Sequence, residues 1–318
     1  MSRRPTATSP FGSGKRESHD SSGFYRRFPA LDLSEDQRVE PAVVRDRLFC
    51  GDARDIGPDQ VADNSVALVV TSPPYFAGKE YEADLGHSGV PGSYLEYLEM
   101  LVQVLAICRA KLEDGGRMAI NVANLGRRPY RSLSADLISI LQDDLGMLLR
   151  GEIIWHKAKG AGGSCAWGSF RSPANPVLRD TTERVIVASK GRFDRAWSRS
   201  ERARRGLPHV STLSTEAFLA ATLDVWEIPA ESATRVGHPA PFPVELPLRL
   251  IELYTYEGDL ILDPFIGSGT TAVAAARSGR HYVGFDTDST YLELAARRLG
   301  TDSAGNDRSA ASSSSPAG

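Results

Sequence analysis

Two short segments of the sequence hold side chains that could do chemistry, and the first is TSPPY at residues 71–75. It directly follows Val66–Val70, an apolar run that predicts a buried strand. Its two prolines fix φ and lack N–H groups, so the turn presents bare carbonyl oxygens, one hydroxyl and one aromatic ring. A purely structural turn with a packed tyrosine is the alternative interpretation.

This set of groups suits a planar ligand that carries an exocyclic amino group. Hydrogen bonds from that amino group to Ser72 Oγ and to the Pro73 carbonyl would localise the nitrogen lone pair, and Tyr75 would stack on the ring. The amine could then attack an electrophilic methyl group directly, without a metal ion or a covalent enzyme intermediate. The sequence accordingly predicts no metal site.

The second segment is a glycine loop between a predicted strand and a predicted helix, DPFIGSGTT at residues 263–271. Glycines let a backbone approach a ligand closely, and the helix start favours a negative ligand group. The lysine of a P-loop and the third glycine of a dinucleotide fingerprint are both missing. Asp286 ends the next predicted strand, 17 residues after Gly269, where an acid can hold ribose hydroxyls. An adenosine-type cofactor is predicted; a helix cap is the alternative role of Asp286.

Short β-branched runs alternate with helical patterns around these two segments. This alternation predicts an α/β fold with a mostly parallel sheet that is covered on both faces. The predicted strands are residues 66–70, 118–122, 152–155, 185–188, 260–262 and 282–285, and the predicted helices are residues 94–112, 242–256, 270–277 and 289–299.

The composition of the 318 residues excludes several classes of protein. Hydrophobic residues make up 41% and charged residues 24%, which excludes collagen-like, coiled-coil and wholly disordered chains. The sequence has no apolar run of membrane-spanning length, and residues 1–22 do not resemble a secretory signal. Three widely spaced cysteines argue against a disulfide framework. We therefore expect a cytoplasmic protein.

Residues 155–210 differ in charge from the rest of the chain. They hold twelve basic and four acidic side chains, a formal surplus of eight positive charges in a chain whose net charge is −3. A localised basic stretch in an otherwise acidic protein predicts a surface that binds a polyanion. A solvated, charge-rich insertion is the alternative.

TSPPY followed by DPFIGSGTT resembles the β-class S-adenosylmethionine-dependent DNA amino-methyltransferases. The resemblance covers about residues 45–300, and it includes the family's Gly-Asp segment at residues 49–52 and its cofactor-side segment at residues 238–243. The order of the motifs separates this class from methyltransferases in which the cofactor loop comes first. The fold implied is a circularly permuted, seven-stranded Rossmann-like sheet with an inserted target-recognition region.

The resemblance also implies a role for each matching residue. Ser72, Pro73 and Pro74 would hold the amino group of a flipped base, and Tyr75 would stack on that base. Asp286 would hold the ribose of the cofactor, and Asp52 would face its adenine. The other residues implied near S-adenosyl-L-methionine are Asp263, Phe265, Gly267, Gly269, Thr270 and Thr271, with His238 and Phe242 toward its methionine end.

Serine at the first motif position resembles the cytosine-N4 enzymes. Physical chemistry alone leaves the base open, because cytosine and adenine both place an amino donor beside a ring-nitrogen acceptor. The resemblance at Ser72 is therefore the reason to predict methylation of cytosine N4 in duplex DNA. An adenine-N6 methyltransferase is the alternative, a catalytically silent cofactor- or DNA-binding protein is a lesser one, and RNA is a third substrate class to test.

The resemblance divides the chain into five regions. These are a flexible tail at 1–38, a catalytic half at 39–157, a basic target-recognition region at 158–235, a cofactor-binding half at 236–300 and a disordered tail at 301–318. Duplex DNA, a second copy of the chain and a cognate restriction endonuclease are the implied partners, and the enzyme would be nucleoid-associated when bound to DNA. The expected DNA contacts are Lys157, Lys159, Trp167, Arg171, Arg199, Arg202, Arg204 and Arg205. A minor-core role for Trp167 and a solvated helix face at residues 199–205 are the alternatives.

Overall fold

A computed structural model describes residues 33–74, 93–124, 130–157, 168–178, 181–230 and 242–312, the last of these by backbone alone from residue 301. The chain divides into two compact units, Met1–Ser34 and Glu35–Gly318. Every helix and strand described below belongs to the second unit. The predictions for Tyr75, Lys159, Trp167 and His238 lie outside the described residues.

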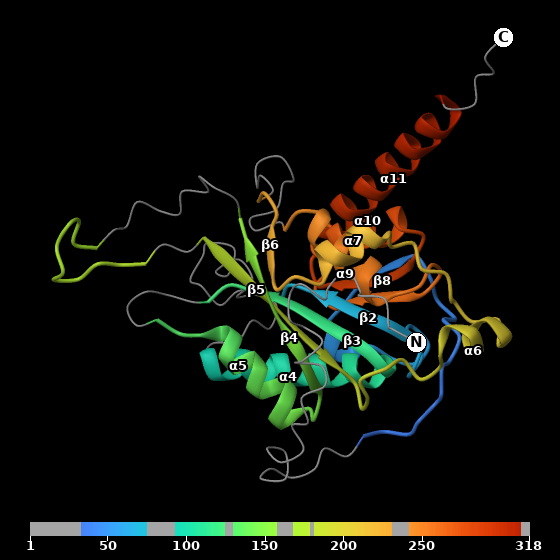
Figure 1. The fold of residues 1–318 in the computed structure, drawn as a ribbon, viewed down its shortest axis with the longest axis horizontal. Coiled ribbons are helices and arrows are strands. Elements are labelled where there is room, and N and C mark those ends of the chain that lie inside the picture. The colour runs from blue at the N-terminus through green and yellow to red at the C-terminus, as the bar shows by residue number, and fades with distance from the viewer. Residues whose placement is uncertain are drawn as a thin grey trace, which may run out of the picture. The chain divides into compact units, whose positions relative to one another are not determined.

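The core of the second unit is one sheet of eight strands in the order β1-β8-β7-β2-β3-β5-β4-β6 (Figure 1). Among the described strands β5 is antiparallel to both of its neighbours, β3 and β4, and the other neighbouring pairs are parallel. The strand bounds are β1 Arg47–Cys50, β2 Val66–Thr71, β3 Leu112–Val122, β4 Leu148–His156, β5 Thr182–Ser189, β6 Val225–Glu227, β7 Leu260–Asp263 and β8 His281–Asp286.

Helices cover both faces of this sheet, as the sequence pattern predicts. α4 and α5 lie on one face, and α7, α9 and α10 lie on the other (Figure 1). Alternate residues of β2 enter the two cores, Val69 the first and Leu68 and Val70 the second. The helix bounds are α4 Tyr94–Lys111, α5 Leu133–Ser139, α6 Arg199–Arg204, α7 Thr215–Ala221, α9 Glu245–Tyr254, α10 Thr270–Arg277 and α11 Ser289–Ser312, with a 3-10 turn at Ala53–Asp55 and a π-helical turn at Ile140–Asp144. None of the described helices is long and apolar enough to cross a membrane.

Three features of the fold differ from the sequence-based expectation. The sheet has an eighth strand, because the three-residue β6 adds to the edge beside β4. The expected target-recognition region 158–235 is not one insertion, because its β-branched residues 182–189 form β5 in the middle of the sheet. The expected disordered tail from residue 301 is helical as far as Ser312, since α11 continues through it.

Candidate functional site

The two motif segments meet at one edge of the sheet, where the parallel strands β2, β7, β8 and β1 all end. Strand register places Asp263 beside Gly284 and Asp286 beside Cys50. Ligands of open α/β sheets bind outside these carboxyl ends. We call this side, with the loops that follow the four strands, the carboxyl edge.

Asp263 is the buried centre of the carboxyl edge, with 2% of its surface exposed. Its Oδ1 accepts hydrogen bonds from Thr71 Oγ1 at 2.6 Å and from the Phe265 N–H at 3.0 Å. Its Oδ2 accepts one from Thr271 Oγ1 at 2.6 Å. Burial raises the pKa of this carboxyl group to about 6, against the lowering effect of these hydrogen bonds. Asp263 therefore joins the end of TSPPY's strand to both ends of the glycine loop.

Helix α11 packs against the glycine loop and stabilises it. Gly269 has a φ of 80°, and a Cβ on it would lie 2.6 Å from the Ala295 Cβ, so only glycine fits there. Arg298 donates from the same helix to the Ser268 carbonyl at 2.7 Å and to Thr270 Oγ1 at 3.1 Å. The loop then leads into α10, whose first turn supplies backbone N–H groups.

Two further carboxylates flank this loop. Asp286 accepts hydrogen bonds from the N–H groups of Gly267 and Asp288, both at 2.9 Å, and burial raises its pKa. Asp52 follows β1, and its side chain accepts from the Arg54 N–H at 2.8 Å and pairs with the Arg54 guanidinium group at 2.6 Å. The side-chain hydrogen bond from Arg54 lowers the pKa of Asp52. The Gly51 N–H donates to the Asp286 carbonyl at 2.9 Å, which ties the two carboxylate-bearing turns together.

Ser72 lies directly after β2, beside the end of β3. Its hydroxyl donates to the backbone carbonyl of Asn121 at 3.1 Å. A carbonyl oxygen can only accept, so the hydroxyl proton points at Asn121 and the Ser72 oxygen keeps acceptor character. Pro73 is buried and Pro74 half-buried, which fixes the chain at this point.

The other described residues expected near the cofactor are buried or half-buried. Phe265 is half-buried next to Asp263, and Phe242 is half-buried before α9, where it packs against the second core. Thr270 and Thr271 are 4% and 1% exposed, so their hydroxyls serve the protein interior. The carboxyl edge thus combines loop N–H donors with carboxylate acceptors, a set of polar groups that suits an adenosine-type ligand with ribose hydroxyls.

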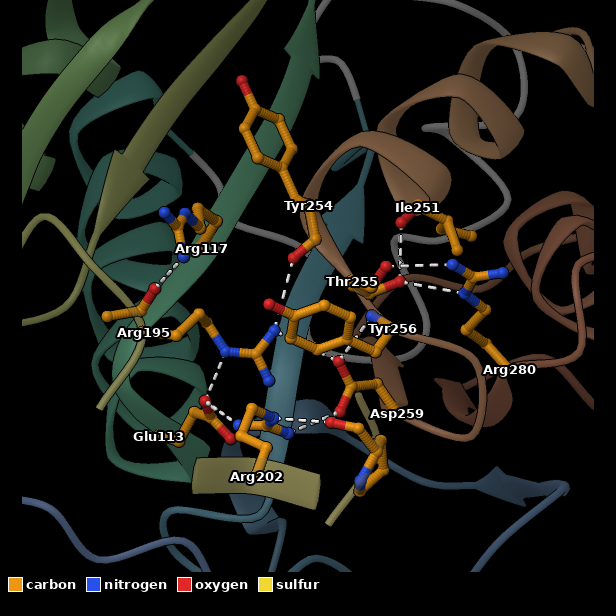
Figure 2. A network of polar contacts seen from close by, with 12 residues as sticks. Glu113, Arg117, Arg195, Arg202, Ile251, Tyr254, Thr255, Tyr256, Asp259 and Arg280 are labelled. Carbon is orange, nitrogen blue, oxygen red and sulfur yellow. Dashed lines mark hydrogen bonds and ion pairs between the residues drawn. The ribbon is translucent and has the colours of Figure 1, made fainter. Parts of the chain in front are cut away.

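Buried ion pairs between side chains stabilise the opposite side of the sheet, where β3 and β7 begin. Glu113 and Asp259 are 2% and 4% exposed, and both pair with Arg195 and Arg202 (Figure 2). The Tyr256 ring lies against both guanidinium groups. We call this side, with the cluster of Glu113, Asp259, Arg195 and Arg202, the amino edge.

The prediction that Arg202 contacts DNA phosphate is wrong. Arg202 is 1% exposed, and its guanidinium lies 3.2 Å from Glu113 Oε1 and 3.0 Å from Asp259 Oδ1. Its Nε donates to the Pro208 carbonyl at 2.6 Å. The arginine-rich segment 199–205 therefore docks α6 on the amino edge, away from TSPPY and the glycine loop.

The remaining basic residues have different surroundings. Arg204 is exposed and pairs with Glu201, Arg205 stacks on Trp197 at 3.6 Å, and Arg199 donates to the His209 carbonyl. Arg171 is exposed with a φ of 56°. Phosphate contacts by these four residues stay predictions. Lys157, in contrast, has a carboxylate partner inside the protein, because it pairs with the buried Glu183.

Several residues of the site carried no sequence signal of their own. Thr71 stands out in the sequence only as part of its motif, yet it joins the two segments through Asp263. Arg298 contacts a loop 28 residues away, and Asn121 contacts Ser72 across 49 residues. Only a strand register or a set of related sequences could have revealed such pairs.

Comparison with known proteins gives consistent matches. A family model described as DNA methylase matches residues 66–297. The type II methyltransferase M.BglI of Bacillus subtilis is 28% identical, over 79% of this chain and 84% of its own length. M.Cfr9I, a type II methyltransferase of Citrobacter freundii, is also 28% identical, over 85% of this chain and 93% of its own.

Solved structures give the same picture. TTHA0409 of Thermus thermophilus, a candidate DNA modification methylase, has a TM-score of 0.62 and 32% identity, covering 80% of this chain and 94% of its own. The same protein has been solved in complex with S-adenosyl-L-methionine. PvuII DNA methyltransferase, a cytosine-N4-specific enzyme, has a TM-score of 0.61 at 20% identity and covers 82% of this chain and 89% of its own, which supports the fold.

Proposed function

Since the chain belongs to the DNA methylase family, we propose that it transfers the methyl group of S-adenosyl-L-methionine to the exocyclic N4 amino group of cytosine in duplex DNA. The observation that carries this proposal is the Ser72 hydroxyl, whose proton is directed at Asn121. The next residue in the chain, Pro73, supplies a backbone carbonyl oxygen as the second acceptor. Two acceptors are thus held at the end of β2, next to the loop expected to bind the cofactor. The order of the two motifs further suggests the β class.

The chemistry follows from these acceptors. When bound, S-adenosyl-L-methionine supplies an electrophilic methyl group on a positively charged sulfur. Ser72 Oγ and the Pro73 carbonyl accept hydrogen bonds from the target NH₂ and so localise its lone pair on nitrogen. The target nitrogen would take the methyl group as the carbon–sulfur bond breaks with its electron pair left on sulfur, and it would release one proton to solvent. Tyr75 would stack on the extruded base.

The cofactor is proposed to lie along the carboxyl edge. Asp286 would accept hydrogen bonds from the ribose, Asp52 would face the adenine, and Phe265 would pack beside it. Gly267, Gly269 and the start of α10 would surround the methionine end together with Phe242 and His238. The structure gives Asp263, Thr270 and Thr271 buried supporting contacts to this loop.

The choice of cytosine comes from the resemblance of Ser72 to the cytosine-N4 enzymes, and adenine N6 is the competing target on the same fold. Duplex DNA is the proposed partner, together with a cognate restriction endonuclease and a second copy of the chain. A cytoplasmic site of action follows from that role.

Methyl transfer from isotope-labelled S-adenosyl-L-methionine to mixed-sequence duplex DNA tests the proposal. After digestion to nucleosides, mass spectrometry should find the label in N4-methylcytosine. Label in N6-methyladenine would keep the reaction and overturn the base. No label in DNA with the cofactor still bound would favour a silent binding protein, and label in a parallel RNA reaction would redirect the substrate.

The Ser72→Ala variant tests the mechanism. Loss of one hydrogen-bonding group to the reacting atom should slow methyl transfer by about a hundredfold or more. The dissociation constant for S-adenosyl-L-methionine should stay within twofold, because the cofactor loop is unchanged. Ser200→Ala, on the exposed face of α6, is the matched control and should keep full activity. Near wild-type activity of Ser72→Ala would contradict the mechanism.

A further inference from the structure

Behind Ser72 lies a chain of buried polar contacts across three strand ends. The carbonyl of Asn121, at the end of β3, accepts the Ser72 proton at 3.1 Å. The side chain of the same residue donates from Nδ2 to Glu183 Oε2 at 2.6 Å. Asn121 is 4% exposed and Glu183 7% exposed. One residue therefore connects the proposed catalytic hydroxyl to a buried carboxylate on β5.

The buried carboxylate has a cationic partner. Glu183 Oε1 pairs with the ammonium group of Lys157, which follows β4 and lies 5.3 Å from the centre of the Trp155 ring. Trp155 is 2% exposed and donates from its indole N–H to the Ile228 carbonyl at 2.8 Å. A buried carboxylate is tolerated only when it is paired and hydrogen-bonded, as Glu183 is here.

These contacts fix the direction of the Asn121 carbonyl. A peptide group is planar, so a residue held by its side chain and by the strand ladder has little freedom to rotate its carbonyl. Asn121 is held in both ways, since it pairs with Val185 of β5 and hydrogen-bonds Glu183. The acceptor that orients the Ser72 proton is then set by β5 and β4.

We propose that Glu183, held by Lys157, is a positioning residue for methyl transfer, acting through Asn121 on the orientation of the Ser72 hydroxyl. This inference rests on the proposed function and deepens it. If Asn121 is held less firmly, the Ser72 hydroxyl can rotate. The Ser72 proton can then point toward the target amino group, where the Ser72 oxygen must instead accept a hydrogen bond. Lys157 thereby has an internal role in place of the phosphate contact expected from sequence.

A double-mutant cycle between Glu183 and Ser72 tests the inference. In single-turnover reactions with saturating cofactor and DNA, Glu183→Ala should lower the methyl-transfer rate constant by about ten- to a hundredfold. The dissociation constants for S-adenosyl-L-methionine and DNA should stay within twofold. In the Ser72→Ala background the same substitution should have no further effect, because the group it positions is gone.

Two other variants keep the test sharp. Glu183→Gln retains an acceptor for Asn121, so its methyl-transfer rate should be higher than that of Glu183→Ala. The glutamine variant should also stay folded even where the alanine variant does not. Glu152→Ala, an exposed glutamate on the neighbouring strand β4, is the control and should keep the wild-type rate. A merely structural role would predict equal slowing by Glu183→Ala in both backgrounds.

The outcomes separate this inference from the proposed function. A wild-type rate for Glu183→Ala, or equal slowing with and without Ser72, overturns the positioning role alone. A wild-type rate for Ser72→Ala overturns the proposed mechanism and the inference with it. A slow Ser72→Ala combined with a slow, non-multiplying Glu183→Ala supports both.

Discussion

Apart from Asp52, which pairs with Arg54 at the carboxyl edge, the two edges of the same sheet hold their carboxylates in opposite ways. At the amino edge, Glu113 and Asp259 are neutralised by the guanidinium groups of Arg195 and Arg202. At the carboxyl edge, the donors that the structure gives Asp263 and Asp286 are hydroxyls and backbone N–H groups, all of them neutral. Negative charge is therefore retained on the side where a sulfonium cofactor is proposed to bind.

This difference changes the interpretation of the basic stretch 155–210. Arg195 and Arg202 neutralise buried acids of the amino edge, Lys190 lies 3.5 Å from Asp114, and Lys157 pairs with Glu183. The first three of these basic residues thus balance acids outside the stretch, whereas Glu183 lies within it. Exposed residues such as Arg171 and Arg199 are better candidates for phosphate contacts than the buried ones.

Removing Arg202 should give the largest effect and would test whether the amino edge is purely a scaffold. Arg202→Ala leaves two carboxylates underpaired in the interior, and we expect a loss of about 3–5 kcal/mol in the free energy of unfolding, measured with urea. The methyl-transfer rate constant of the folded fraction should not change.

Arg204→Ala is the matched control, because Arg204 is on the same helix in an exposed ion pair. It should cost about 0–1 kcal/mol. A reduced salt dependence of DNA binding in Arg202→Ala, with stability intact, would show that the arginine contacts phosphate after all and would break the contrast between the edges.

Two glycine substitutions would sharpen the contrast. Gly269→Ala places a methyl group against Ala295 at a positive φ, and we expect a loss of about 2–4 kcal/mol in unfolding free energy together with weaker cofactor binding by calorimetry. Gly279→Ala, at the other edge, has a similar φ of 71° but meets only the flexible Glu257 side chain at 3.2 Å. It should cost about 1–2 kcal/mol and leave cofactor affinity unchanged. Equal loss of affinity in both variants would contradict the assignment of the loop.

The smallest effect should appear as a pH dependence from Asp263. Burial raises the pKa of Asp263 to about 6, so the folded protein binds the proton of this carboxyl group more tightly than the unfolded chain does. The resulting stabilisation is present at pH 4 and is lost as the pH rises through about 6. Relative to Asp263→Asn, wild-type stability should therefore fall by about 2 kcal/mol between these pH values, measured by thermal unfolding. A difference that stays flat with pH would show that the carboxylate is compensated in the fold.

The local parts of the site were predictable from sequence because their signals are contiguous. The β-branched run before TSPPY and the strand-loop-helix pattern around DPFIGSGTT give both segments and their strands, and α10 has the predicted bounds. Gly115 shows the limit. It stands between the predicted helix 94–112 and the predicted strand 118–122, but it lies within β3, where a Cβ would come within 1.8 Å of the Asp194 carbonyl oxygen.

Long-range pairing explains what was missed. Arg202 looked like a surface residue in a charged segment, yet its partners Glu113 and Asp259 are 89 and 57 residues away. Asn121 and Glu183 are 62 residues apart and gave no pattern. Burial of a charge depends on where distant strands come together, and neither composition nor periodicity encodes that.

The strand order has a consequence for how the molecule is made. β1 pairs with β8, and β2 pairs with β7 on one side, so strands near the start of the chain need partners near its end. A ribosome delivers β7 and β8 last, and contacts of such sequence separation form slowly. Until β7 and β8 have been made, β1 lacks its hydrogen-bonded neighbour among the described strands. Over the same period β2 is paired on one side only, with β3. We expect the sheet to close only after residue 286 has left the exit tunnel, so the nascent chain exposes unpaired strands to chaperones until β8 is complete.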